Sequence, residues 1–168
     1  MRLPRLFLTT GVVVLLATAT GCSHPTSPST PLTLTRFRGD SAGFLAFSGY
    51  DTAQTIVIHD RDTWVRTWSD INRRTTPLPA LPDVDFTSEM VVVAALGTRP
   101  SSGYDVVFTS ASEAGEIVTV EVESRAPGAG CVTLTVITSP VDLARIPRRN
   151  GAITFRTTPK VTTCGAVP

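Results

Sequence analysis

The chain has 168 residues, with 15 Lys and Arg against 14 Asp and Glu and a formal net charge of +1. This near-neutral balance argues against nucleic-acid binding, which requires a clustered basic surface. The length fits one folded domain once the N-terminal segments described next are set aside.

Residues 1–21 predict a signal peptide. Arg2 and Arg5 precede an apolar run over 6–19, which leads into the small residues before Cys22. A run of about fourteen apolar residues is too short to span a bilayer, which takes about twenty. The segment is therefore expected to be a removable leader.

The sequence A-T-G-C, which ends at Cys22, is similar to a bacterial lipobox, whose cysteine is acylated and becomes the new N-terminus. Ordinary secretion with cleavage nearby is the alternative. We predict lipidation of Cys22, a tether rich in Pro, Ser and Thr over 22–33, and a single domain over 34–168. The protein would then be exported and anchored by lipid to the bacterial cell membrane or outer membrane.

Two further cysteines, Cys131 and Cys164, remain in the domain. Because thiols oxidise in exported proteins, we predict a disulfide that ties down the C-terminal tail. Closing a loop of this length should stabilise the fold by about 3 to 4 kcal/mol in the chain-entropy model. A redox or metal role is the alternative, although the spacing is far from C-x-x-C.

In chain order, apolar alternation first predicts strands over 32–37, 43–49 and 54–59. Trp64 and Trp68 then recur at helical spacing behind Asp60 or Asp62, which are candidate N-caps, and predict an amphipathic helix over 63–74. The proline-broken stretch 75–85 is predicted to be a surface loop.

The run 89–97 is almost continuously apolar and bounded by turn signals, which predicts a central strand buried on both faces, one of them against the helix. Further strands are predicted over 104–111, 115–124, 131–139, 142–148 and 152–157. Short connections favour antiparallel meander pairing. The predicted fold class is α+β and mainly β: an antiparallel sheet or sandwich with one amphipathic helix packed on it.

No residue pattern predicts catalysis, a cofactor, a metal or a small-molecule substrate. His59 is the one histidine of the predicted domain, and neither G-x-S-x-G nor a phosphate-binding loop occurs. A lone strand histidine is more often a packed or surface residue than a base. Asp83 with Asp85, and Glu121 with Glu123, are interpreted as solvated pairs, because calcium needs several oxygens within one short loop.

The sequence TRPSSG at 98–103 predicts a hairpin loop, with Pro100 setting φ and Gly103 permitting a positive φ. Polar loops of this kind are also where partners are usually met. Tyrosine and arginine, both present here, are enriched where interfaces concentrate their energy. The loop is therefore predicted to bind an envelope protein.

The residues predicted to contact this partner are Arg99, Ser101, Ser102 and Tyr104, joined by Arg148 and Arg149 if the two turns lie at the same end of the sheet. Two alternatives remain open. Tyr104 becomes a packing residue if it points into the core, and the two later arginines become a solvated turn if they lie elsewhere.

Three segments together resemble the C-terminal domain of the PrcB family: LGTRPSSGYDVVF at 96–108, VESRAPGAGCVTLTVITSPVDLARIPR at 122–148 and AITF at 152–155. The likeness covers residues 54–156, and the lipoprotein leader also fits. Members of that family are known as accessory subunits of surface protease complexes. The resemblance implies a non-catalytic module that assembles with or stabilises a protease.

The stretch RPSSGY is also similar to the N-P-T-T-G-Y loop of chagasin-type cysteine protease inhibitors, which present three loops to a protease cleft. PGAG at 127–130 corresponds to their Gly-rich loop, but only PRRNG at 147–151 stands in place of their R-P-W loop. The alternative functions are an inhibitor that uses the 98–104 loop, or a structural envelope lipoprotein with no protease link.

Overall fold

A computed structural model describes residues 28–37 and 46–164. Its elements are β1 (Thr30–Leu32), β2 (Thr35–Arg36), β3 (Ala53–Ile58), α1 (Arg61–Ile71), β4 (Glu89–Leu96), β5 (Asp105–Ala114), β6 (Ile117–Pro127), β7 (Val141–Pro147) and β8 (Ala152–Thr162). The predicted signal peptide, Cys22 and residues 43–45 of the predicted strand 43–49 lie outside the described residues. Residues 46–49 do not form the predicted strand, since Phe47 makes only an isolated bridge to Ser139. Within the described ranges, no helix is long and apolar enough to cross a membrane.

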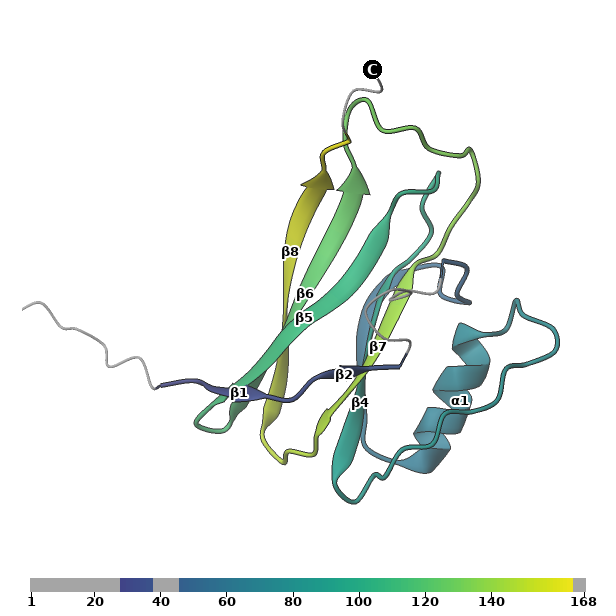
Figure 1. The fold of residues 1–168 in the computed structure, drawn as a ribbon. Helices are drawn as coiled ribbons and strands as arrows, with labels where there is room; N and C mark the ends of the chain where they lie inside the picture. Colours follow the sequence, from purple (N-terminus) through teal and green to yellow (C-terminus); the bar gives the residue numbers. More distant parts are fainter. Residues whose placement is uncertain (1–27, 38–45, 165–168) are drawn as a thin grey trace, which may run out of the picture.

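The strands form two four-stranded sheets (Figure 1). Sheet A has the order β1-β5-β6-β8, and sheet B has the order β2-β7-β4-β3. All pairs are antiparallel except β6 with β8, which run parallel. The mainly β class with one helix is confirmed. The expected meander is wrong, because β4 and β5 lie in different sheets and β8 pairs with β6.

The strand β4 is buried on both faces, as predicted. Its side chains alternate between two layers, because successive residues of a strand point to opposite faces. Met90 and Val92 pack in the core shared with sheet A. Val91 and Val93 pack with Trp64 in a second core under the helix.

The helix α1 begins at a capped end and covers sheet B. The Asp60 carboxylate accepts a hydrogen bond from the Thr63 N–H at 2.8 Å, as an N-cap should. The indole Nε1 atoms of Trp64 and Trp68 donate to the carbonyl oxygens of Pro82 and Pro79, each at 2.9 Å. The two tryptophans therefore hold the proline-broken loop against the helix as well as filling the core.

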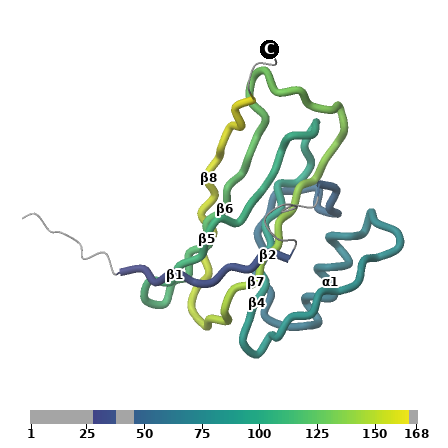
Figure 2. Tube along the Cα trace, viewed as in Figure 1, coloured from purple at the N-terminus to yellow at the C-terminus, as the bar shows by residue number. Residues whose placement is uncertain are grey.

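The N-terminal segment joins the two sheets along one side (Figure 2). β1 pairs with β5 of sheet A, and β2, two residues later, pairs with β7 of sheet B. The predicted strand 32–37 is thus two short strands in different sheets. Because β1 begins at Thr30, inside the predicted tether, the domain begins earlier than the predicted boundary at residue 34. Residues 30–32 join the domain through backbone pairing with β5 rather than through an apolar pattern.

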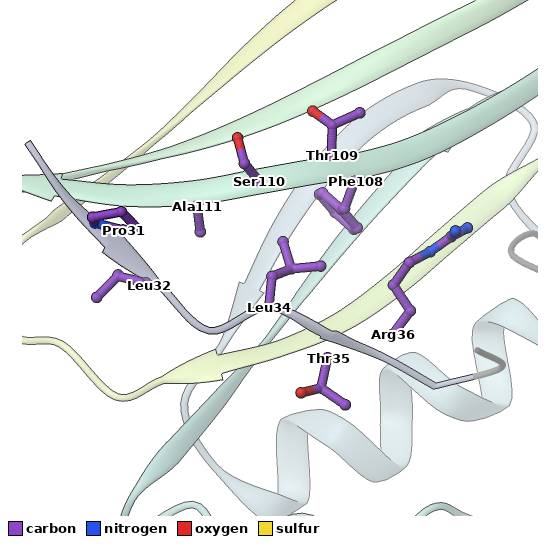
Figure 3. Close-up of a pocket in the computed structure, with 9 residues that line it drawn as sticks. All are labelled: Pro31, Leu32, Leu34, Thr35, Arg36, Phe108, Thr109, Ser110 and Ala111. Atoms are coloured by element: carbon purple, nitrogen blue, oxygen red, sulfur yellow. The ribbon is translucent and has the colours of Figure 1, made fainter. Parts of the chain in front are cut away.

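Beneath this crossing lies a hollow of about 500 Å³ (Figure 3). Leu34 points toward Phe108 across it, whereas Thr109 and Ser110 extend to the other side of β5. Two successive side chains share that side because the β5–β6 register shifts between Phe108 and Ser110, as at a β-bulge. The hollow therefore lies at the corner where the N-terminal segment passes from sheet A to sheet B.

Beside this corner, one buried carboxylate connects three strands. Asp142 of β7, whose side chain is 2% exposed, forms an ion pair with Arg36 of β2 at 3.1 Å. It also accepts the N–H of Phe108 of β5 at 2.8 Å. Burial raises the pKa of Asp142 to about 6, although the Phe108 N–H and the Arg36 guanidinium oppose this shift.

Asp142→Asn should reduce the dependence of stability on pH between about pH 4 and pH 7. With a pKa of about 6 when folded and near 3.8 when unfolded, Asp142 binds its proton more tightly in the folded chain. That stabilisation is full below the unfolded pKa and is lost as pH rises through the folded pKa. The loss is about 3 kcal/mol at most, from the cost of one pKa unit.

Urea unfolding at several pH values measures this effect. The free energy of unfolding of the native chain should fall relative to that of Asp142→Asn as pH rises. Asp83→Asn, at an exposed loop position, is the matched control for removing one carboxylate. Parallel curves for the native chain and Asp142→Asn would contradict the assignment.

Candidate partner-binding surface

The predicted partner loop, residues 97–104, connects β4 of sheet B to β5 of sheet A. It is a connection between sheets, so the predicted hairpin is wrong. Gly97 and Gly103 have φ of 72° and 90°, in the left-handed region that favours glycine. The predicted positive φ at Gly103 is therefore confirmed. A side chain at Gly97 would also meet the backbone of Ala53 and Thr52.

A second connection, which we call the crossing segment (residues 128–139), runs beside this loop. It leaves sheet A after β6 and enters sheet B at β7, over the end of the sandwich where β6 and β8 finish (Figure 1). The predicted strand 131–139 is wrong, since only isolated bridges form, Arg99 with Thr138 and Phe47 with Ser139.

Hydrogen bonds join the loop to the crossing segment. The N–H of Ser102 donates to the Leu134 carbonyl at 3.0 Å, and the Ser102 hydroxyl accepts the Leu134 N–H at 2.8 Å. The Arg99 N–H donates to the Thr138 carbonyl at 2.7 Å, and the Thr138 hydroxyl donates to the Ser101 carbonyl at 3.0 Å. Both serines predicted to face a partner therefore hold the crossing segment in place.

The predicted disulfide between Cys131 and Cys164 is confirmed, with the two Cα atoms 5.1 Å apart. It fastens the start of the crossing segment to the residues that follow β8. A turn precedes it, in which the Cys131 N–H donates to the Gly128 carbonyl at 3.2 Å. The segment is thus fixed at its start by a covalent bond and farther along by hydrogen bonds.

Although its backbone is held, the crossing segment exposes large apolar side chains, which we call the apolar ridge. Its members and their exposed fractions are Val132 (91%), Leu134 (70%), Val136 (36%) and Ile137 (67%). Phe47, which is 56% exposed, adjoins the segment through its bridge to Ser139. Sequence reasoning missed this ridge, because threonine alternating with apolar residues is equally the pattern of a half-buried strand.

Tyr104 and Arg99 lie together beside the ridge. Tyr104 is half-buried and packs against the core of sheet A, while the Arg99 guanidinium lies over its ring, 5.8 Å from the centroid. This geometry fits a cation–π contact. Among the described residues, the buried Nε of Arg99 has no hydrogen-bond partner. Tyr104 therefore serves as packing, and Arg99 reaches the surface across it.

A charged cluster borders the same end of the sandwich. Both Arg73 and Arg74 pair with Asp51, whose carbonyl accepts the Thr98 N–H at 3.0 Å. The side-chain hydrogen bond from Arg74 is the largest of the effects that lower the pKa of Asp51. Arg74 also donates to the Ser139 hydroxyl at 3.1 Å. The cluster links the helix end, the loop and the crossing segment.

Arg148 and Arg149 lie at the opposite end of the sandwich. β4 and β7 are antiparallel with Glu89 opposite Pro147, so these arginines follow β7 where β4 begins, whereas Arg99 follows the end of β4. Arg148 donates to the carbonyls of His59 and Phe86 at 2.8 and 2.9 Å. Arg149 pairs with Glu113 at 2.9 Å. The two predicted groups of partner residues are therefore separate.

Over 28–37 and 46–164, no group of three or more His, Cys, Asp and Glu side chains could hold a metal ion. His59 is exposed just after β3. The one strongly buried carboxylate, Asp142, is engaged by Arg36 and Phe108.

Comparison with known families places this surface in context. Residues 90–147 match the family model described as PrcB C-terminal, which confirms the resemblance read from the sequence. The matched range includes the 97–104 loop and the whole crossing segment. It suggests the role of a subunit associated with a protease complex. No curated protein and no solved structure matches the chain.

Removing the disulfide by Cys131→Ser with Cys164→Ser should destabilise the domain and loosen the ridge. A bridge that closes 33 residues contributes about 3 to 4 kcal/mol in the chain-entropy model. Urea unfolding should show this loss, and amide exchange should accelerate at Leu134 and Ser102 more than along β4. Val132→Ser, at a largely exposed position, is the control and should change stability by less than about 0.5 kcal/mol. Unchanged amide exchange at Leu134 in the double variant would contradict the conclusion that the disulfide holds the crossing segment in place.

Proposed function

We propose that the protein is a non-catalytic subunit of an envelope protease complex, anchored through a lipid on Cys22, which binds its partner through the apolar ridge and Arg99. The exposure of the ridge on an ordered backbone is the observation that carries this proposal. The match to the PrcB C-terminal family supports the link to a protease.

The ridge has the energetics of a docking surface. Burying an exposed Leu or Ile side chain contributes about 1.5 to 3 kcal/mol, so Leu134 and Ile137 together can supply a large part of a binding energy. The disulfide and the hydrogen bonds from Ser102 already order the segment. Binding therefore costs less conformational entropy than ordering a free loop would.

The surroundings of the ridge indicate the chemistry of the partner. Arg99, Arg73 and Arg74 lie at the same end and carry two more positive charges than Asp51 offsets. Interfaces commonly combine an apolar centre with a polar rim of complementary charge. The partner is expected to present an apolar groove bordered by carboxylates.

The position of the ridge suits a membrane-tethered protein. The N-terminal strand β1 pairs with Ala111–Glu113, near the far end of β5, whereas β5 begins beside the 97–104 loop. At about 3.4 Å per residue, these two points on β5 are some 20 Å apart. A tether from Cys22 that enters at β1 would leave the ridge accessible to a neighbouring protein.

The structure favours docking over insertion into a protease cleft. A cleft-blocking inhibitor requires a projecting loop, but residues 99–102 are hydrogen-bonded along the crossing segment. The exposed groups nearest to them belong to the crossing segment itself. An inhibitor that uses the 98–104 loop is therefore the less favoured function.

The paired substitution Leu134→Ser with Ile137→Ser should release the protease from the complex. The tagged full-length chain is captured from host membranes in mild detergent, and the captured proteins are measured by mass spectrometry and by proteolytic activity. Losing two apolar side chains that the complex would bury should reduce the captured activity by more than about tenfold. Val65→Ser with Ile117→Ser, two exposed apolar positions elsewhere, is the matched control.

Equal capture of the protease by both paired variants would rule out the ridge as the docking surface. Capture of no protease by the native chain would favour the structural lipoprotein instead. Mixing the purified chain with the captured protease then separates helper from inhibitor, because an inhibitor lowers the activity whereas a subunit preserves or raises it.

A further inference from the structure

On the side away from the β1–β2 crossing, each sheet ends in an edge strand whose outer side pairs with no described strand. β8 is last in sheet A and β3 is last in sheet B, and among the described residues β3 pairs with β4 alone. An edge strand presents a row of N–H and C=O groups to which another strand can add. This surface is separate from the apolar ridge and does not depend on the function proposed above.

The two edges differ in how they are protected. β8 carries Arg156, Pro159 and Lys160, and charges and proline on an edge strand discourage pairing with another chain. β3, with the sequence AQTIVI, has neither a charge nor a proline along its six residues. Its composition is instead that of a strand suited to pairing, with β-branched residues at four positions.

An uncharged hollow of about 270 Å³ opens between the sheets beside β3. Its lining includes Ala53 and Thr55 of β3, Leu96 of β4, Val106 of β5 and Val122 of β6. A strand added to the edge of β3 would extend sheet B and place alternate side chains along this hollow. The free edge and the hollow therefore point to the same occupant, an extended and uncharged strand.

We propose that β3 pairs with β3 of a second copy of this chain, antiparallel across a two-fold axis. Ala53, Thr55 and Val57 pair with the residues of β4 that face sheet A, whereas Gln54 and Ile56 pair with those that face the helix. Residues opposite one another in the joined sheet must share a face. The axis therefore passes through a residue, and an axis at Thr55 or at Ile56 pairs the most residues of the strand.

Charges at the ends of β3 fit both registers. In either register, the end of β3 where Asp51 pairs with Arg73 and Arg74 lies beside the other end of β3 in the second copy, which carries Asp60, Arg61 and Asp62. The first group has a net charge of +1 and the second a net charge of −1. Opposite charges facing each other across a strand pair stabilise it, and like charges destabilise it. β3 is thus self-complementary in both hydrogen bonding and charge.

A cysteine at Thr55 tests the pairing directly. The full-length chain with Thr55→Cys is treated in host membranes with a bismaleimide cross-linker that spans about 8 Å, the diagonal separation across a strand pair. The expected result is a product of twice the chain mass. Thr158→Cys on the exposed face of β8 and the unsubstituted chain are the controls, and neither should give this product.

A charge at the same position gives the second test. Thr55→Lys brings like charges together across the axis, so sedimentation in mild detergent should show the mass of the complex reduced by one copy. Thr158→Lys should leave that mass unchanged. Both positions are exposed, so both variants are expected to fold. Urea unfolding checks this.

Three outcomes would overturn the proposal. Thr55→Cys could remain uncross-linked in a folded chain, or it could cross-link no more than Thr158→Cys does. A product whose added mass is that of another protein would mean that β3 pairs with a different strand. None of these results bears on capture of a protease through the ridge, so the two proposals fail independently.

Discussion

The arrangement of the domain depends on one strand, β4, that must bury both of its faces. Val91 and Val93 require the cover of α1, and Met90 and Val92 require the cover of sheet A. A strand apolar on both sides is stable only between two layers, so the helix and the second sheet follow from it. The same constraint fixes where β4 ends. The chain leaves it at Leu96 and must cross to the other sheet, which places the 97–104 loop at one end of the sandwich.

Where this core does not reach, polar and covalent contacts hold the chain. Asp142 joins β7 to Arg36 of β2 and to the backbone of β5, so a single buried carboxylate links both sheets at the N-terminal crossing. The Cys131–Cys164 bond and the hydrogen bonds of Ser102 act similarly at the other connection. Burying a charge costs desolvation energy. Only well-placed hydrogen-bond and ion-pair partners offset that cost. These contacts allow an irregular segment to keep one conformation while its apolar side chains face solvent.

Two surfaces of different kinds result from this construction. The apolar ridge is irregular, and it offers side chains whose burial supplies binding energy. The edge of β3 is regular, and it offers backbone groups that fix direction and register. Neither surface is used within the described domain, because the side chains of the ridge face solvent and the outer edge of β3 pairs with no other described strand.

The sequence by itself determined the features that depend on local pattern. These include the doubly buried strand at 89–97, a helix capped by Asp60 or Asp62, the positive φ of Gly103, the pairing of Cys131 with Cys164 and the family likeness. Only the tertiary structure decided what covers each segment. Residues 131–137 alternate like a half-buried strand, yet they cross between sheets and stay exposed, while Tyr104 is half-buried and Arg148 lies at the far end from Arg99. The physical reason is that alternation specifies which side chains share a face, whereas burial of that face depends on strands and loops distant in the sequence.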